Sequence, residues 1–483
     1  MKHKLLLRFL CATVVIGAVA AVAFGQEQAT EESKVATPAT STIATPAVGN
    51  ATKTMETAAP VATRAHPLFI DILAARGLKK PSGTTAGFKS ASNSGSAGVS
   101  PNASPFVFET QAEGKSGDDT GVGRTLPLFT FRVRSSRDGN KYSGSMVGQN
   151  PFHAPGETKV PTKVIPLIIK TQNLAVSFDP NTGIITTTPG VATFDPTRAD
   201  AQNACLTKPN NVPTHLVKQS PIFTSTNFVF GGTNVGTTQY SDAFQRANFW
   251  KALGRDTDDY HVLLDPVQFL DPITLEVPDV YGVAITDLLF FGAPPSCAPL
   301  GIVDINWFDT YLTGTVIPSL AEDVDPTNFP VFLVYNVVWA APANNLATCC
   351  ILGYHGTTGF PIPTQTYSPA DFDTTGDFAA NFLPIDTAVL SHEVDEWMDD
   401  PMVSNPTPPW GHTGQVSGCQ ANVEVGDPLS GTFIPAVTMP NGFTYHLQEL
   451  AFFSWFFGTP STAVNGWFSD NGTFLTDAGP PCH

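Results

Sequence analysis

Short apolar runs rich in β-branched and aromatic residues recur along the chain, and they constrain its fold more than any other feature. The clearest are Lys163–Thr171 (KVIPLIIKT) and Pro330–Ala341 (PVFLVYNVVWAA), while Leu126–Ser135 alternates apolar and polar positions. Runs of this length between turn residues are typical of strands. Asn181–Gly183 lies between two such runs, which predicts a hairpin over Ala175–Gly190. Because Gly and Pro are plentiful, we also expect long loops.

Helical signals are fewer. They occur in four segments: Ser241–Leu253, Asp304–Leu320, Leu383–Asp400 and Tyr445–Gly458. In the first of these, Phe244, Ala247 and Trp250 recur at helical spacing after a candidate N-cap at Ser241. Many strands with a few interspersed helices indicate an α+β fold that is β-rich.

The N-terminal part of the chain has the composition of a leader and a linker. Residues 1–25 join a basic start to an apolar run and small residues, which predicts a signal peptide. Residues 26–105 are rich in Ala, Thr, Ser and Gly, which predicts a disordered linker or a pro-segment, with a helical turn or two at His66–Gly77. We expect two further regions, a β-rich region of unknown role over 106–330 and a metal-binding domain over 331–483. The protein should therefore be secreted, periplasmic or extracellular, and no later stretch is apolar enough to span a membrane.

The cysteine count agrees with export. Of seven cysteines, Cys11 lies in the predicted leader, and the other six can pair as disulfides. Cys349 and Cys350 are adjacent, so we expect them to bond to different partners.

The charge balance narrows the range of partners. The formal net charge is −17, without clustered Lys and Arg, which argues against nucleic acid and anionic lipid as partners. An acidic chain can bind cations, although exported proteins are often acidic for solubility alone. The oligomeric state stays open.

The segment Ser391–Pro401 (SHEVDEWMDDP) carries the strongest chemical signal. On a helix that ends before Pro401, His392 and Glu396 lie on one face, Glu393 lies one step round, and Asp399 returns to that face. Two ligands four residues apart with a Glu between them form the pattern of the zinc-binding HExxH helix, here with Glu in the second place. Carboxylate ligands also suit harder ions, so zinc is the expected metal and calcium the alternative.

Further ligands must come from elsewhere in the chain. Glu424 and Asp427 in the following acidic loop are the first choice, and His412, His446 and His355 are other candidates. Acidic pairs at this spacing are common on solvated helices, which is the competing interpretation. The apolar start of this helix favours burial, and buried like charges are destabilising unless a cation compensates them.

These segments also resemble a known signature. SHEVDEWMDDP, a Trp-containing loop and CQANVEVGDPL resemble the HE-x-x-E…(N/D)P…W…E-(I/V)-x-D pattern of the plant phosphate-induced/EXORDIUM family and of exported bacterial proteins that look like zincin-type zinc metallopeptidases. The resemblance covers about 335–457. It implies a C-terminal zincin-like metal-binding region, with His392 and Glu396 as metal ligands and Glu393 as the water-activating base. Glu424 and Asp427 take the places of the second acidic motif.

Two functions are compatible with these observations. The first is an exported zinc-dependent metallopeptidase that hydrolyses protein or peptide substrates. The alternative is a non-catalytic extracellular protein, associated with a cell wall or a ligand, in which the same acids hold a structural cation such as calcium.

Overall fold

The computed structural model describes residues 64–81, 125–153, 155–206, 211–254, 256–359, 364–379, 384–476 and 482. The predicted signal peptide and most of the predicted linker lie outside these residues. The strands are β1 (Arg64–Phe69), β2 (Leu128–Arg134), β3 (Lys141–Val147), β4 (Glu157–Phe178), β5 (Ile185–Phe194), β6 (Thr226–Phe230), β7 (Thr233–Thr238), β8 (His261–Phe269), β9 (Ile273–Glu276), β10 (Gly282–Ile285), β11 (Leu300–Asp304), β12 (Phe329–Tyr335), β13 (Val337–Ala340), β14 (Ile351–Thr358), β15 (Gln365–Phe372), β16 (Pro406–Thr413), β17 (Val416–Asn422), β18 (Val437–Thr438) and β19 (Thr444–Tyr445). The α-helices are α1 (Ile72–Ala75), α2 (Pro213–Lys218), α3 (Tyr240–Asn248), α4 (Trp250–Leu253), α5 (Ile305–Tyr311), α6 (Ile317–Ser319), α7 (Ala388–Asp399) and α8 (Phe453–Phe457).

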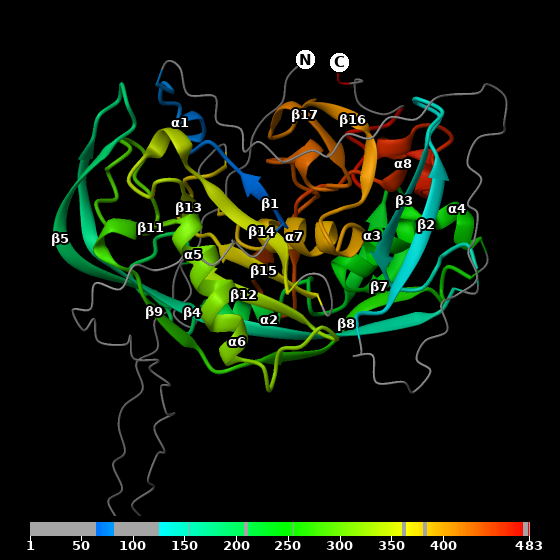
Figure 1. Ribbon diagram of the computed structural model, residues 1–483, viewed down its shortest axis with the longest axis horizontal. Helices are drawn as coiled ribbons and strands as arrows, with labels where there is room; N and C mark the ends of the chain where they lie inside the picture. Colours follow the sequence, from blue (N-terminus) through cyan, green and yellow to red (C-terminus); the bar gives the residue numbers. More distant parts are fainter. Residues whose placement is uncertain are drawn as a thin grey trace, which may run out of the picture. The chain divides into compact units, whose positions relative to one another are not determined.

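Seven strands form a closed barrel, and Figure 1 labels β4, β12, β14 and β15 among them. They follow one another in the order β14, β13, β11, β10, β4, β12, β15, and a further pairing of β14 with β15 closes the ring. β5, β8 and β9 pair with β4, and β1 pairs with β14. Small hairpins, β2–β3, β6–β7, β16–β17 and β18–β19, make separate two-stranded sheets. Closure protects strand edges that would otherwise be open for pairing.

The apolar run at Pro330–Ala341 supplies two adjacent, fully buried strands of the barrel. It forms β12 and β13, which are buried at every position and are separated by Asn336 with a φ of 52°. β12 is parallel to both of its neighbours, β4 and β15, and such strands are covered on both faces. Val331 and Leu333 accordingly join one apolar cluster, and Phe332 and Val334 join another.

Several expectations about single elements are confirmed. β2 forms within Leu126–Ser135, β4 includes Lys163–Thr171, and the β4–β5 hairpin turns at Asn181–Gly183, where Gly183 has a φ of 75°. α3 and α4 occupy Ser241–Leu253 almost completely. The segment Asp304–Leu320 is helical from α5 through a π turn to α6.

The expectation of an α+β fold with a zincin-like C-terminal region is wrong. The structure is a β-rich barrel with few helices, and it does not show a zincin-like metal region. The barrel takes β4, β10 and β11 from the region before residue 329 and its other four strands, β12 to β15, from Phe329 onward. The expected helix over Tyr445–Gly458 is also too long, because only Phe453–Phe457 is helical. Its aromatic side chains are all buried, so they pack in several directions instead of along one helix face.

Three disulfides link the described cysteines: Cys205–Cys297, Cys349–Cys350 and Cys419–Cys482. The expected disulfides are therefore present, but the expectation that Cys349 and Cys350 bond to different partners is wrong. The other four cysteines pair among themselves, which leaves the two adjacent ones for each other. Disulfides of this number fit an oxidising compartment.

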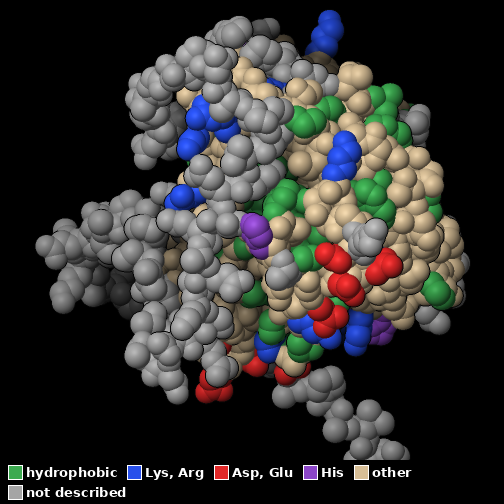
Figure 2. Space-filling view, turned by 90° about the vertical axis from the view of Figure 1, so that its right-hand side faces the viewer, with side chains coloured by type: hydrophobic (Ala, Val, Ile, Leu, Met, Phe, Trp, Pro, Cys, Tyr) green, Lys and Arg blue, Asp and Glu red, His purple; other side chains and the backbone are tan. Residues whose placement is uncertain are grey.

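None of the helices within the described ranges is long and apolar enough to cross a membrane. On the face drawn in Figure 2, Lys and Arg side chains are scattered, and a small group of Asp and Glu side chains lies beside some of them.

Part of the predicted linker is folded. β1 lies beside β14, and α1 follows it after two residues (Figure 1). Leu68, Ile72 and Leu73 are each at most 1% exposed, so this short segment belongs to the core. The island predicted at His66–Gly77 is thus a strand followed by one helical turn.

Candidate metal centre

Helix α7 carries the HExxE residues, and polar contacts fix both of its ends. Before its start, Asp386 accepts hydrogen bonds from the backbone N–H of Thr387 and of His446, at 2.6 and 2.9 Å. Beyond its last residue, Asp400 accepts the backbone N–H of Ser404 at 2.7 Å, so the helix stops before the proline at 401 as expected. Every residue of α7 is buried, which is unusual for a helix with so many acids.

The contact at the start of α7 predicts a pH dependence of stability. His446 Nδ1 lies 2.7 Å from Asp386 Oδ2, and this hydrogen bond raises the pKa of His446 above its usual 6.5 although burial opposes the rise. A group whose pKa is higher in the folded state contributes its full stabilisation at pH values below its unfolded-state pKa. This stabilisation is lost as the pH rises through the folded-state pKa. We expect His446→Gln to lower the free energy of unfolding more at about pH 5.5 than at about pH 9. Urea unfolding of both proteins at the two pH values measures this, and equal losses would contradict the pairing.

Two glycines allow close approaches to α7. A Cβ on Gly353 of β14 would lie 2.7 Å from Val389 Cγ1 and 2.8 Å from Glu393 Cγ, so only glycine lets the strand lie this close to the helix. His355 lies two residues further along β14, which puts it on the same face of the strand. On the other side, a Cβ on Gly426 would overlap the ring of His392. These approaches bring one barrel strand and the loop after β17 onto the two sides of α7.

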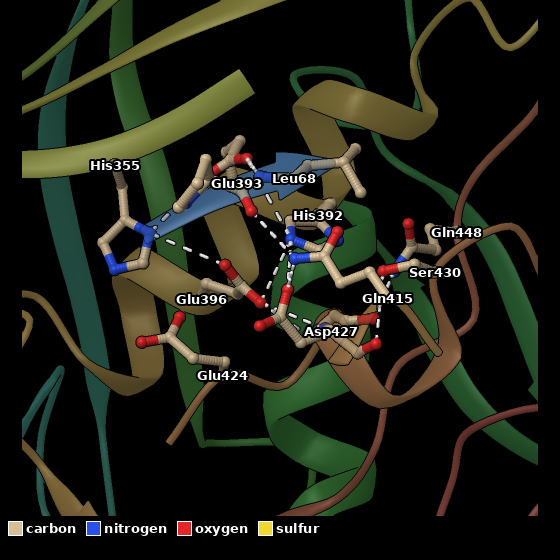
Figure 3. A network of polar contacts seen from close by, with 12 residues as sticks. Leu68, His355, His392, Glu393, Glu396, Gln415, Glu424, Asp427, Ser430 and Gln448 are labelled. Carbon is tan, nitrogen blue, oxygen red and sulfur yellow. Dashed lines mark hydrogen bonds and ion pairs between the residues drawn. The ribbon is translucent and has the colours of Figure 1, made fainter. Parts of the chain in front are cut away.

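Six side chains converge between these elements (Figure 3). We call them the His392 cluster: His355, His392, Glu393, Glu396, Glu424 and Asp427. All have side chains that are buried, at most 6% exposed. Two groups within the cluster have ligand atoms within 4.8 Å of one another: His355, Glu393 and Glu396 form one, and His392, Glu396 and Asp427 form the other.

Glu396 belongs to both groups because its two oxygens face different histidines. Oε1 lies 3.1 Å from His392 Nε2 and also accepts the backbone N–H groups of Gly426 and Asp427 at 3.1 and 3.2 Å. Oε2 lies 3.7 Å from His355 Nδ1. The carboxylate therefore lies between the two imidazoles and also ties the acidic loop to α7.

Glu393 and Asp427 complete the two groups. Glu393 Oε2 lies 3.5 Å from His355 Nδ1, and its Oε1 lies 4.0 Å from His392 Nε2. Asp427 Oδ1 lies 3.7 Å from His392 Nε2. Glu393 therefore faces both imidazole rings, whereas Asp427 faces that of His392.

Burial and the charges of neighbouring groups determine the protonation of the cluster. Burial opposes the charged ring of His392, but the charge of Glu396 and its hydrogen bond raise the pKa of His392 to about 10. Burial would raise the pKa of Glu396, but the charge of His392, the hydrogen bond from its ring and the charge of His355 lower it to about 2. Burial, with the negative charge of Glu396, raises the pKa of three further carboxyls well above the usual range: Glu393, Glu424 and Asp427. One ion pair is thus surrounded by carboxyls whose ionisation needs additional positive charge.

The chemistry of the donor set fits a divalent metal. Imidazole nitrogens and carboxylate oxygens are zinc ligands, and the nitrogens favour zinc over calcium, which takes oxygen ligands. Among the described residues, no Lys or Arg pairs with Glu393, Glu396 or Asp427. In the same part of the chain, His392 Nδ1 and Glu393 Oε2 make no hydrogen bond although both are buried. Buried polar atoms of this kind call for a compensating partner.

The structure brings together most of the residues singled out in the sequence. His392, Glu396 and Asp427 share one group, and Glu393 lies beside them with His355. Glu424 accepts a hydrogen bond from Asn422 and interacts with Glu396, but it lies outside both groups.

Three other candidate residues, Asp399, His446 and His412, lie elsewhere. Asp399 accepts a hydrogen bond from Gln245 of α3 at 3.0 Å, and His446 pairs with Asp386. His412 is exposed and lies near Cys419 and Cys482, whose sulfurs form a disulfide.

Two residues next to the His392 cluster, Gln415 and Leu68, have no signal in the sequence. Gln415 donates to Asp427 Oδ1 and to the carbonyl oxygen of Pro67, and it accepts the backbone N–H of Phe69. Leu68 donates its backbone N–H to Glu393 Oε1 at 3.2 Å. Main-chain partners leave no residue pattern that a sequence argument can use.

Comparison with known proteins adds no relative: no family model, no curated protein and no solved structure matches the chain.

Proposed function

We propose that the protein is an exported metal-dependent hydrolase that cleaves peptide bonds and that zinc is its metal. The observation that carries the proposal is the position of Glu396, whose two oxygens face His392 and His355 while Glu393 lies beside both rings. The resemblance of SHEVDEWMDDP and CQANVEVGDPL to the exported metallopeptidase-like proteins supports it. The three disulfides support export.

The proposed roles follow from the contacts. His392, Glu396 and Asp427 would hold the ion, and the chemistry that such an ion supplies is Lewis acidity toward a carbonyl oxygen and a water. Glu393 would accept the proton of the attacking water. His355, at 3.5 Å from Glu393 Oε2, would keep that carboxylate in position. Gly426 permits the close approach of the acidic loop to His392.

A structural cation site is the second candidate, and one observation favours it. The side chains of His355, His392, Glu393 and Glu396 are 0% exposed, so a substrate has no access to them in this conformation. Glu396 Oε1 also binds two backbone N–H groups of the acidic loop, a contact that would fix that loop whether or not chemistry follows. In this case calcium is the alternative ion.

Hydrolysis of a peptide library separates the two candidates. The purified protein is treated with a chelator and reloaded with zinc or with calcium, and cleavage products are identified by mass spectrometry. Because the backbone N–H of Leu68 donates to Glu393 Oε1, the protein is also tested after proteolytic removal of the segment that contains residues 64–81. We expect this shortened form to cleave peptides, and we expect the cleavage to disappear on chelation and to return with zinc. Folding that depends on calcium, without cleavage by either form under any condition, would favour the structural alternative.

A further inference from the structure

Strand β1 lies over the His392 cluster in the manner of a bound peptide. It pairs antiparallel with β14, and Leu68 lies opposite Gly353, the glycine that lets Glu393 approach the strand. The backbone N–H of Leu68 donates to Glu393 Oε1 at 3.2 Å. Figure 3 shows β1 passing beside Glu393 with Leu68 and Gln415 next to the cluster. A segment from near the N-terminus thus touches the residue assigned as the catalytic base.

The polar contacts of Pro67–Ile70 within this segment use the main chain. Gln415 Nε2 donates to the Pro67 carbonyl at 2.8 Å, and its Oε1 accepts the N–H of Phe69. Ile70 exchanges two backbone hydrogen bonds with Cys350, each 2.9 Å long. Because every peptide has the same main-chain groups, a separate extended peptide could make these contacts in place of β1.

The segment also has anchors outside the cluster. Leu68 contributes a side chain that is 1% exposed, which provides a defined apolar position within the strand. Past α1, Arg76 lies 3.3 Å from Asp377 Oδ1, and both side chains are 1% exposed. Arg76 also donates to the carbonyl oxygen of Pro294 and lies over the Phe291 ring. An apolar side chain and a buried ion pair therefore hold the segment independently of Glu393.

We propose that β14 and the side chain of Gln415 form a binding surface for an extended peptide, and that Pro67–Ile70 occupies this surface in the intact chain. The occupant blocks Glu393 and explains why the cluster is inaccessible. A peptide with an aliphatic residue in the place of Leu68 is the matching external ligand. Calling this ligand a substrate rests on the proposed function, whereas peptide binding does not.

Weakening the occupant without changing the surface tests the proposal. The double variant Leu68→Asp, Arg76→Ala is made in the full chain, with Lys79→Ala, an exposed position of the same segment, as the matched control. The probe is a fluorescent peptide of residues 65–72 (AHPLFIDI), and its binding is measured by fluorescence anisotropy. A tethered occupant competes at an effective concentration in the millimolar range, so the double variant should bind the peptide at least about tenfold more tightly than the control.

Two further measurements keep the test decisive. A chain with a specific protease site inserted after Ser82 is cut and freed of residues 1–82, and it should bind the probe as the double variant does. A probe with an N-methyl group on its leucine lacks the N–H that faces Glu393, so it should bind at least about tenfold more weakly. Equal binding of the probe by the control, the double variant and the cut protein would overturn the proposal, as would equal binding of the methylated probe.

Hydrolysis is recorded in the same samples and separates the two proposals. If the freed surface binds the probe but no peptide is cleaved with zinc present, the peptidase function fails and the binding surface stands. If the intact control chain cleaves peptides as fast as the cut chain, the occupant does not block the site and the inference fails while the peptidase function stands.

Discussion

Replacement of Glu396 by alanine is expected to lower the free energy of unfolding by about 3–5 kcal/mol and to abolish zinc binding. The side chain is fully buried, and its Oε1 meets His392 Nε2 at 3.1 Å. Its removal leaves a buried imidazolium without its anion and two loop N–H groups, those of Gly426 and Asp427, without their acceptor. The first loss falls on α7, and the second falls on the loop that carries the proposed ligand Asp427.

Urea unfolding of Glu396→Ala, followed by tryptophan fluorescence, measures the loss of stability. Glu322→Ala is the matched control because Glu322 is an exposed acid outside the cluster. Glu396→Gln keeps an acceptor for the loop N–H groups and should be destabilised less than Glu396→Ala. If the alanine variant unfolds at the same urea concentration as the control, the proposed role of this carboxylate is wrong.

Replacement of Glu393 by glutamine should lower kcat/KM for peptide hydrolysis by about 10²- to 10⁴-fold and leave metal content and folding unchanged. The amide has the shape of the carboxylate and can still accept the backbone N–H of Leu68, but it cannot take a proton from water. The groups assigned to hold the metal, those of His392, Glu396 and Asp427, stay in place.

The measurement uses the cut chain, in which β1 no longer covers Glu393, with zinc supplied to both proteins. Glu393→Asp serves as the companion variant, because it restores a base at a different distance and should recover part of the rate. Hydrolysis by Glu393→Gln at the wild-type rate, with the same metal content, would falsify the assignment of Glu393 as the base.

The local residue pattern is sufficient to predict part of the His392 cluster. The spacing of His392, Glu393 and Glu396 on one helix predicts their neighbouring positions, because helix geometry fixes which side chains share a face. The acidic loop with Asp427 lies close to them along the chain, and the structure places it against His392. The same spacing misplaces Asp399, whose carboxylate contacts Gln245, since packing of α7 against α3 decides where that end of the helix points.

The remaining parts depend on contacts between distant segments. His355 joins the cluster only because Gly353 lets β14 lie against α7. The residue pattern around Gly353 does not predict this close approach. The barrel depends on the pairing of β14 with β15 and of β4 with several strands, whereas apolar runs predict strands without their order. Leu68 contributes a main-chain group, so its residue type gave no indication of a role.

Metal analysis of the folded protein decides whether the His392 cluster binds zinc. Wild type, Glu396→Ala and the control Glu322→Ala are dialysed against equal concentrations of zinc and calcium, washed, and analysed by inductively coupled plasma mass spectrometry. We expect about one or more equivalents of tightly bound zinc in the wild type and the control, and none in Glu396→Ala. Absence of bound metal from the wild type, or equal metal in all three proteins, would contradict it.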